Sequence, residues 1–297
     1  MNAGNKKIVL LKGGISAERE VSLRTGAAVA AALSSLQYKV SEIDVTARDF
    51  KIEAGALAVY ICLHGTFGED GELQSRLERE GLNFTGSGSR ACQNAFDKLK
   101  TKRLFHEHGV PTPRGGPWKP GEHCPIPCVL KPVSEGSSVG VSIVRLESEL
   151  APAVAASARL DKPMMAEELV EGREVTVGIL GDRALPLVEI RPHSGFFDYR
   201  NKYTAGMTEH ICPAVFDENT TLAAQEAALA AHAALGCRVY SRVDVIIKPD
   251  GSPVVLEVNT IPGMTEISLL PEAARAAGIG FAQLCEKILN LSLEERP

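Results

Sequence analysis

The segment SRVDVIIKPDGSPVVLEVNT, residues 241–260, reads as two strands joined by a turn. Side chains on a strand alternate between its faces, and Asp250-Gly251 is a strong signal for a two-residue hairpin turn. A hairpin centred on that pair makes residues face one another when their numbers add to 250 + 251 = 501. One face is then wholly apolar and consists of the opposed pairs Val243 and Val258, Val245 and Leu256, and Ile247 and Val254.

The other face of this hairpin is polar, because Asp244 lies opposite Glu257 and Arg242 lies opposite Asn259. Like charges directly opposite destabilise a strand pair by about 0.2–1 kcal/mol, so a positive group is expected between the carboxylates. Two carboxylates and an amide suit Mg²⁺, which usually leaves room for substrate phosphates. The alternative is a solvated face with Arg242 as the counter-ion, and the assignment depends on the register.

Length and composition favour a globular protein of about two or more domains. The chain has 297 residues, of which 44% are hydrophobic and 23% charged. Its net charge of -5 and the lack of a long basic block argue against nucleic acid or an anionic membrane as partner. The apolar run near the start is too short for a signal peptide, and no run is long enough for a membrane span.

The seven cysteines are scattered singly along the chain. Cys124 and Cys128 are the closest pair and stand beside His123, but no second ligand pair accompanies them. A zinc site there is therefore disfavoured, and reduced thiols in a cytoplasmic protein are expected instead.

The order of elements predicts three subdomains, at residues 1–87, 88–168 and 169–297. The first reads as strand, helix, strand, helix, which is typical of an open parallel α/β unit that binds ligands beyond the strand ends. The other two contain antiparallel pairs and are expected to be mixed α+β. One helix is expected across NAFDKLKTKRLF, residues 94–105. The long loop 192–210 is predicted to be a lid over bound substrates.

Two segments compete as a phosphate site, and the Walker pattern is absent. TGSGSRA, residues 85–91, offers a weak dinucleotide signal without the acidic residue expected about 20 positions later. The loop SEGSSVG, residues 134–140, is more informative, because its serines and backbone N–H groups can enclose phosphates. Lys98 and Lys131 precede it, and with the carboxylate hairpin they indicate phosphoryl transfer.

Several motifs along the chain together resemble those of a known family. GGISAEREVSL (13–23), HGTFGEDGELQ (64–74), LKPVSEGSSVGVS (130–142), EGREVTV (171–177) and the hairpin with the following NTIPGMTEISLLP are similar, in order, to D-alanine–D-alanine ligases of the ATP-grasp fold. The resemblance implies that two α+β subdomains clamp ATP. It also implies ligation of two D-alanines through an acyl phosphate for peptidoglycan and cell-wall synthesis, in the cytoplasm and as a homodimer.

The resemblance also implies roles for individual residues. The nucleotide site is implied to contain Lys98, Lys131, Ser137, Ser138, Glu167, Glu168, Leu169, Val170, Glu174 and Lys202. Magnesium, as two ions, or Mn²⁺ in its place, is implied to bind Asp244, Glu257 and Asn259. The catalytic groups are implied to be Glu18, Ser137, Tyr203, Arg242 and Gly263. Amino-acid binding is implied for Glu18, His64, Arg242, Gly263, Ser268 and Leu269.

The sequence departs from the family pattern at two places, and two other functions are considered as alternatives. The 103–128 segment is short, with little room for a helix, and Ile267 stands where many relatives carry histidine. A related ligase could join D-alanine to D-lactate or D-serine, although Lys202-Tyr203 resembles the dipeptide-forming members. A nucleotide-binding protein without catalysis is the third possibility, which the full set of charged residues disfavours.

Overall fold

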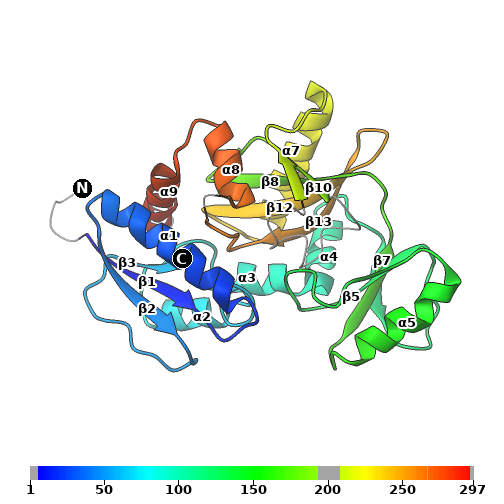
Figure 1. Cartoon of the computed structure of the whole chain (residues 1–297), viewed down its shortest axis with the longest axis horizontal. Helices are drawn as coiled ribbons and strands as arrows, with labels where there is room; N and C mark the ends of the chain where they lie inside the picture. Colours follow the sequence, from blue (N-terminus) through cyan, green and yellow to red (C-terminus); the bar gives the residue numbers. More distant parts are fainter. Residues whose placement is uncertain (1–5, 193–207, 266, 295–297) are drawn as a thin grey trace.

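The computed structural model describes residues 6–192, 208–265 and 267–294, which form three sheets with helices around them (Figure 1). The first sheet is parallel, with strand order β2-β1-β3. Its elements are β1 (Lys7–Gly13), α1 (Arg19–Ser35), β2 (Lys39–Val45), β3 (Ala58–Ile61) and α2 (Glu72–Arg79). The predicted parallel α/β unit is therefore present, but β2 was not expected from the sequence. Its half-exposed side chains give it no continuous apolar run.

The helix expected over residues 94–105 is in fact two helices, α3 (Ser89–Phe96) and α4 (Lys98–Glu107). Asp97 separates them in an extended conformation, and its side chain accepts hydrogen bonds from the N–H groups of Leu99 and Lys100. An aspartate in this N-cap position starts a new helix, because it satisfies donors that have no partner in the first turn. Lys98 consequently lies at the start of α4.

The second sheet is antiparallel, with strand order β4-β7-β5-β6. Its elements are β4 (Gly115–Trp118), β5 (Cys128–Pro132), β6 (Ser142–Val144), α5 (Glu147–Ala158) and β7 (Met164–Glu168). Between α4 and β5 the chain forms only β4, as the short 103–128 segment predicted. Figure 1 shows this sheet with α5 at one end of the molecule.

The third sheet carries the hairpin of the opening segment, in the order β11-β10-β8-β12-β13 with β9 beside β8. Its elements are β8 (Arg173–Leu180), β9 (Arg183–Ala184), β10 (Val188–Pro192), β11 (Thr208–Ile211), α7 (Glu218–Ala234), β12 (Tyr240–Ile247) and β13 (Pro253–Asn259). Val243, Val245 and Ile247 lie in one buried cluster with alanines of α7. The predicted apolar face of the hairpin therefore packs on this helix.

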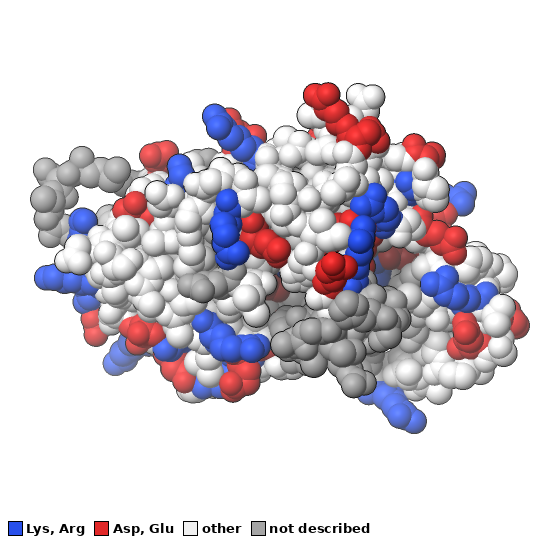
Figure 2. Space-filling model, turned by 45° about the horizontal axis from the view of Figure 1, so that its top comes forward, with Lys and Arg blue, Asp and Glu red and all other residues white. Residues whose placement is uncertain are grey.

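The last two helices lead from the third sheet back to the N-terminal unit, because the first of them packs on β8 and β10 and the second on α1 and β3. Helix α8 (Leu269–Ala276) and helix α9 (Phe281–Glu294) follow the hairpin, and α9 stands beside α1 (Figure 1). Leu284 and Ile288 share one buried cluster with Ile8 and Val29. Among the described residues, no helix is both long and apolar enough to cross a membrane. Figure 2 shows acidic and basic side chains interspersed over one face, consistent with the modest net charge.

Candidate active site

A cavity between the second and third sheets collects most of the predicted nucleotide residues. It is lined by Lys98, Lys131, Ser138, Glu167, Glu168, Leu169, Val170 and Glu174, together with Asp244 and Glu257. A smaller cavity shares Lys98, Glu135 and Glu257 with the first and also contains Asn259 and Glu69. Residues from four distant parts of the sequence therefore meet at adjoining cavities.

The hairpin register agrees with the prediction at the polar end only. Arg242 faces Asn259 and Asp244 faces Glu257, but Val245 faces Val255 rather than Leu256. Likewise Ile247 faces Pro253 rather than Val254.

The turn and a bulge explain the difference. Lys248 N–H donates to Ser252 and Gly251 N–H donates to Lys248, so the turn has three residues, with Gly251 at φ +83°. A three-residue turn of this kind ends in a left-handed residue. It shifts the register by one, and a β-bulge between Asp244 and Val245 restores it.

The bulge decides which side chains reach the cavity. Leu256 is the extra residue of β13, and both Leu256 and Glu257 line the larger cavity. On a regular strand, consecutive side chains would point to opposite faces. The bulge therefore lets one strand supply an apolar wall and a carboxylate at the same site.

Asp244 is the most enclosed of the predicted metal ligands, with only 4% of its surface exposed. Arg242 donates to both of its carboxylate oxygens at 2.8 and 2.9 Å. Thr176 Oγ1 donates to it at 2.7 Å and Asn259 Nδ2 at 3.2 Å. Arg242 is thus the counter-ion, as one interpretation held, but Asp244 is buried and the rest of the face is only partly exposed.

The chemistry of Asp244, Glu257 and Asn259 fits a divalent cation. They provide two carboxylates and an amide on neighbouring strands at the cavity walls. Among the described residues, no cluster of three or more His, Cys, Asp or Glu could hold a metal, so water and phosphate oxygens would have to complete the shell. Arg242 would compete with such an ion for Asp244.

The predicted phosphate loop reaches across to the N-terminal unit. Ser137 Oγ donates to a carboxylate oxygen of Glu18, which precedes α1. Ser137 and Ser138 have φ of 52° and 57°, a left-handed conformation that is uncommon for residues other than glycine. Lys98 Nζ donates to the Glu135 carbonyl oxygen at 2.6 Å, which holds the loop against α4.

A buried charge cluster surrounds Glu167 in the wall of the larger cavity. Glu167 is bonded by Lys131 at one carboxylate oxygen, and the Lys102 ammonium lies 2.9 Å from the other. Burial raises the pKa of the Glu167 carboxyl, but the two lysines outweigh burial and hold that pKa below its ordinary value. Sequence reasoning did not identify Lys102, because a lysine in a helix is usually a surface charge.

The strand end that follows Glu167 is fixed by its neighbours. The Arg114 side chain and N–H group donate to the Glu168 carboxylate at 2.8 and 2.9 Å. The N–H group of Leu169 donates to the Pro127 carbonyl at 3.2 Å. The wall of the cavity at 167–170 therefore depends on the connection from β4 to β5.

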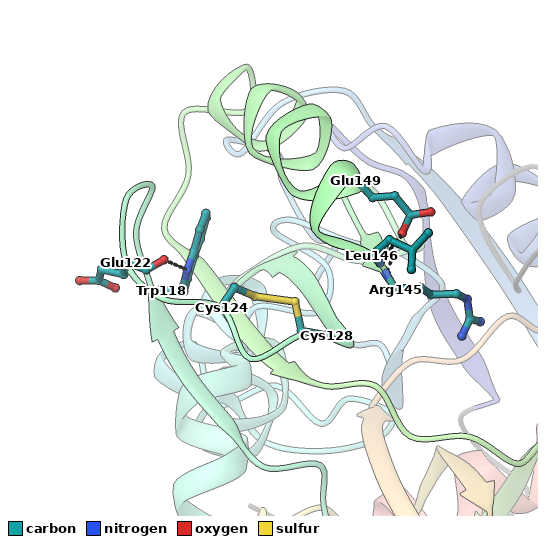
Figure 3. The surroundings of a disulfide bond; sticks show 7 residues. All are labelled: Trp118, Glu122, Cys124, Cys128, Arg145, Leu146 and Glu149. Atoms are coloured by element: carbon teal, nitrogen blue, oxygen red, sulfur yellow. Dashed lines mark hydrogen bonds between the residues drawn. A yellow bond between two sulfur atoms is a disulfide. The ribbon is translucent and has the colours of Figure 1, made fainter.

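That connection contains a disulfide between Cys124 and Cys128, which corrects the expectation of seven reduced cysteines (Figure 3). Trp118 Nε1 donates to the Glu122 carbonyl oxygen and folds the connection back on itself. The two sulfurs meet in the apolar cluster beside Trp118. The other five cysteines, Cys62, Cys92, Cys212, Cys237 and Cys285, are free.

His64 is enclosed, with 4% of its surface exposed, and lines neither of the two cavities. Its Nδ1 lies 3.0 Å from the Ile261 carbonyl oxygen, and its Nε2 lies 3.1 Å from Thr25 Oγ1. Burial lowers the pKa of His64, but Glu69 and the Ile261 carbonyl outweigh burial, so the pKa lies above its ordinary value. In this structure His64 joins the N-terminal unit to the loop after β13.

The residues predicted to bind the second substrate surround the start of α8. Ser268 is the N-cap of this helix, and its Oγ lies 2.8 Å from Thr265 Oγ1. The side chain of Leu269 is buried in the apolar core, so only its backbone N–H group is available to a ligand. The N–H groups of a helix start suit a carboxylate. Ile267 is 83% exposed.

The remaining predictions have separate outcomes. Lys202, Tyr203 and most of the expected lid at 192–210 lie outside the described residues. The dinucleotide alternative at 85–91 is wrong, because Glu78 accepts hydrogen bonds from Ser89 N–H and Oγ at 2.7 and 2.6 Å. A carboxylate thus occupies the helix start where a phosphate would bind.

Comparison with known proteins identifies the family. The family model described as the D-Ala–D-Ala ligase C-terminus matches residues 119–290. A D-alanine–D-alanine ligase from Methylacidiphilum infernorum is 50% identical over 289 residues, which cover 97% of this chain and 95% of the relative. The chain belongs to the D-alanine–D-alanine ligase family. A relative from Moorella thermoacetica is 43% identical, with 97% and 99% of the two chains covered.

Solved structures of ligases share the whole architecture. A Bacillus anthracis D-alanine–D-alanine ligase has a TM-score of 0.85 and 34% identity, with 97% of each chain covered. Its ATP complex has a TM-score of 0.84 and 31% identity over the same share. The VanG D-Ala:D-Ser ligase from Enterococcus faecalis has a TM-score of 0.83 and 29% identity, with 97% and 99% covered. The ligase fold therefore also serves an enzyme with a different second substrate.

Proposed function

We propose that this protein uses ATP to join two D-alanines into D-alanyl-D-alanine for peptidoglycan synthesis. The observation that carries the proposal is 50% identity to a D-alanine–D-alanine ligase over 97% of the chain. The cavities agree with it, because lysines, carboxylates and Ser138 line a space shared by two sheets. Such a site can position ATP beside a second, smaller ligand.

In the first step, a carboxylate oxygen of one D-alanine attacks the γ-phosphorus of ATP, and ADP leaves. Lys98 and Lys131 supply positive charge toward the phosphates, and Ser138 lies on the same wall. Lys202 is assigned the same role from its sequence position. Glu174 is assigned to the ribose, and the segment 167–170 to adenine. Mg²⁺, as two ions, or Mn²⁺, would neutralise phosphate oxygens when bound to Asp244, Glu257 and Asn259.

In the second step, the amine of the other D-alanine attacks the acyl phosphate, phosphate leaves, and the nitrogen loses a proton. Glu18 is assigned to the ammonium of the first D-alanine, and its bond to Ser137 supports this position. Arg242 and the Gly263 N–H group are assigned to the oxyanion. Ser268 and the Leu269 N–H group are assigned to the second carboxylate.

Some assignments rest on the sequence or on chemistry alone. Tyr203 is assigned to the network of Ser137 and Glu18 by its position in the motif. His64 is assigned to the surroundings of the first substrate through its contact with Thr25 and Ile261. The use of ATP supports a cytoplasmic location. A homodimer is proposed from family resemblance, and light scattering of the purified protein tests it.

The second candidate is a ligase that accepts D-serine, favoured by the match to VanG D-Ala:D-Ser ligase. Phosphate release from Mg²⁺-ATP separates the candidates when measured with D-alanine, L-alanine, D-lactate and D-serine. We expect phosphate release when D-alanine is the sole amino acid present, and no phosphate release with L-alanine. Release that is independent of D-alanine would refute both candidates, and release only with D-alanine plus D-serine would favour the second.

A further inference from the structure

Lys102 on α4 belongs to the buried charge cluster with Glu167 and Lys131, yet it does not line the nucleotide cavity. Its Nζ lies 2.9 Å from Glu167 Oε2, and Lys131 Nζ binds Glu167 Oε1. The side chains of Lys102, Glu167 and Lys131 are 12%, 4% and 9% exposed. Solvent therefore screens these charges only weakly.

Lys102 is held in place from behind. Its Nζ also donates to the Pro113 carbonyl and lies 3.5 Å from Thr112 Oγ1. Glu167 and Lys131 both line the cavity, so Glu167 stands between an inner lysine and a lysine that can reach a ligand. Because of this order, the Lys102 charge offsets the Glu167 charge and makes the electrostatic potential at the ligand more positive.

The net charge of the cluster depends on Lys102. Two ammonium groups and one carboxylate add to one positive charge, whereas Lys131 and Glu167 alone add to zero. A buried pair that is neutral overall attracts an anion far less than one with a free positive charge.

We propose that Lys102 is a positioning residue for nucleotide phosphates, because it compensates Glu167 and leaves the charge of Lys131 available to the phosphates. The inference rests on the proposed function of the cavity as the ATP site. The competing explanation is that Lys102 only ties α4 to residues 112–113.

The test measures the affinities for ATP and for adenosine by calorimetric titration. The difference between the two affinities reports the contribution of the phosphates. Lys102→Met keeps the apolar stem and removes the charge. We expect its ATP affinity to fall about tenfold or more, while its adenosine affinity changes less than about twofold. The control is Lys100→Met on the same helix, where the side chain is 50% exposed and lies 3.8 Å from Asp97. The control should leave both affinities unchanged.

The double variant Lys102→Met/Glu167→Gln tests the charge explanation even if the single variant fails to fold. Both changes together leave one positive charge, that of Lys131, so the ratio of adenosine to ATP dissociation constants should return to near the wild-type value. A ratio in the double variant that stays tenfold below the wild-type ratio would overturn the proposal. So would a Lys102→Met variant that melts at a lower temperature but keeps the wild-type ratio. Failure of the wild type to bind ATP would refute the proposed function instead.

Discussion

At the scale of single residues, the interior contains polar groups that the active site does not use. Tyr60 on β3 is 1% exposed, and the weak donor and acceptor beside its hydroxyl is the Cys285 thiol, with no nitrogen or oxygen partner among the described residues. Burial raises the pKa of this phenol well above its ordinary value. A buried hydroxyl without a good partner costs free energy, so its removal should be favourable.

We therefore expect Tyr60→Phe to raise the free energy of unfolding by about 1 kcal/mol. Urea titration of the wild type and the variant measures this difference. The matched control is Tyr38→Phe, because the Tyr38 hydroxyl donates to Glu286 at 3.1 Å. This control should lose about 0.5–1.5 kcal/mol. A loss of stability in Tyr60→Phe would show that its hydroxyl has a partner.

His232 predicts a pH dependence of stability. It is buried near the end of α7 and its Nδ1 lies 2.7 Å from Ser241 Oγ, and burial lowers its pKa from 6.5 to about 4. Between pH 4 and pH 6.5 the unfolded chain binds more protons at His232 than the folded chain does. The stability contributed by the neutral, buried His232 is therefore fully present above pH 6.5 and is lost as the pH falls toward 4. Between pH 7 and pH 5 the loss is about 2 kcal/mol.

Replacement of His232 by Gln should remove this part of the pH dependence. Unfolding free energies at pH 7 and pH 5 should then differ by about 2 kcal/mol less than in the wild type. The exposed His106 on α4 supplies the control, since His106→Gln should leave the difference unchanged. Equal pH dependence in His232→Gln and the wild type would contradict the buried neutral imidazole.

At the scale of elements, the hairpin β12–β13 combines a packing face and a chemical face. Its apolar residues pack on α7, and Asp244 and Glu257 line the cavity from the other face. Glu257 is less enclosed than Asp244, with 32% of its side chain exposed against 6%. The fold therefore depends less on the Glu257 charge than on Asp244.

Glu257→Gln should reduce turnover by about 100-fold or more while the fold persists, because a charge that meets the metal and phosphates is lost. The melting temperature without ligand should stay nearly equal, because the relief of repulsion from Asp244 is offset by the loss of attraction to the Lys98 ammonium, 3.9 Å from Glu257. Phosphate release and melting curves with and without Mg²⁺-ATP measure both effects. Wild-type activity together with wild-type stabilisation by Mg²⁺-ATP would make Glu257 a structural residue.

At the scale of the whole molecule, the site is assembled from units that lie far apart in the chain. Ser137 and Glu18 are 119 positions apart, and their hydrogen bond joins the second sheet's loop to the start of α1. The neighbouring Ser138 lines the larger cavity instead. We therefore expect the two adjacent serines to act on different substrates.

Alanine substitutions at the two serines should separate these roles. Ser137→Ala loses a hydrogen bond to a carboxylate worth about 1.5–3 kcal/mol, and should raise the KM for the first D-alanine about tenfold or more. Ser138→Ala should raise the KM for ATP and leave the KM for D-alanine near its wild-type value. Steady-state kinetics with each substrate varied in turn provides the measurement. The same change of both constants in both variants would argue against separate roles.

Local patterns in the sequence were sufficient for many of the elements, although not for β2 or the break between α3 and α4, and for part of the site. The opposition of Asp244 and Glu257 agrees with the register predicted from the sequence, but it arises because the bulge after Asp244 compensates for the three-residue turn. Eight of the residues that the resemblance assigned to a nucleotide site line one cavity. The parallel strands β1 and β3 follow from their continuous apolar runs.

Only the tertiary structure decided the features that depend on distant packing. The bulge that turns both Leu256 and Glu257 toward the cavity arises within a sheet in which β12 also pairs with β8. Lys102 meets Glu167, and α9 packs beside α1, through contacts between segments far apart in the chain. Alternation and helical period describe neighbours along the chain, whereas burial and charge pairing depend on which surfaces meet after folding. For this reason the sequence alone indicated the ligase family and most of its strands, whereas only the fold showed β2 and the charged partners of Lys102.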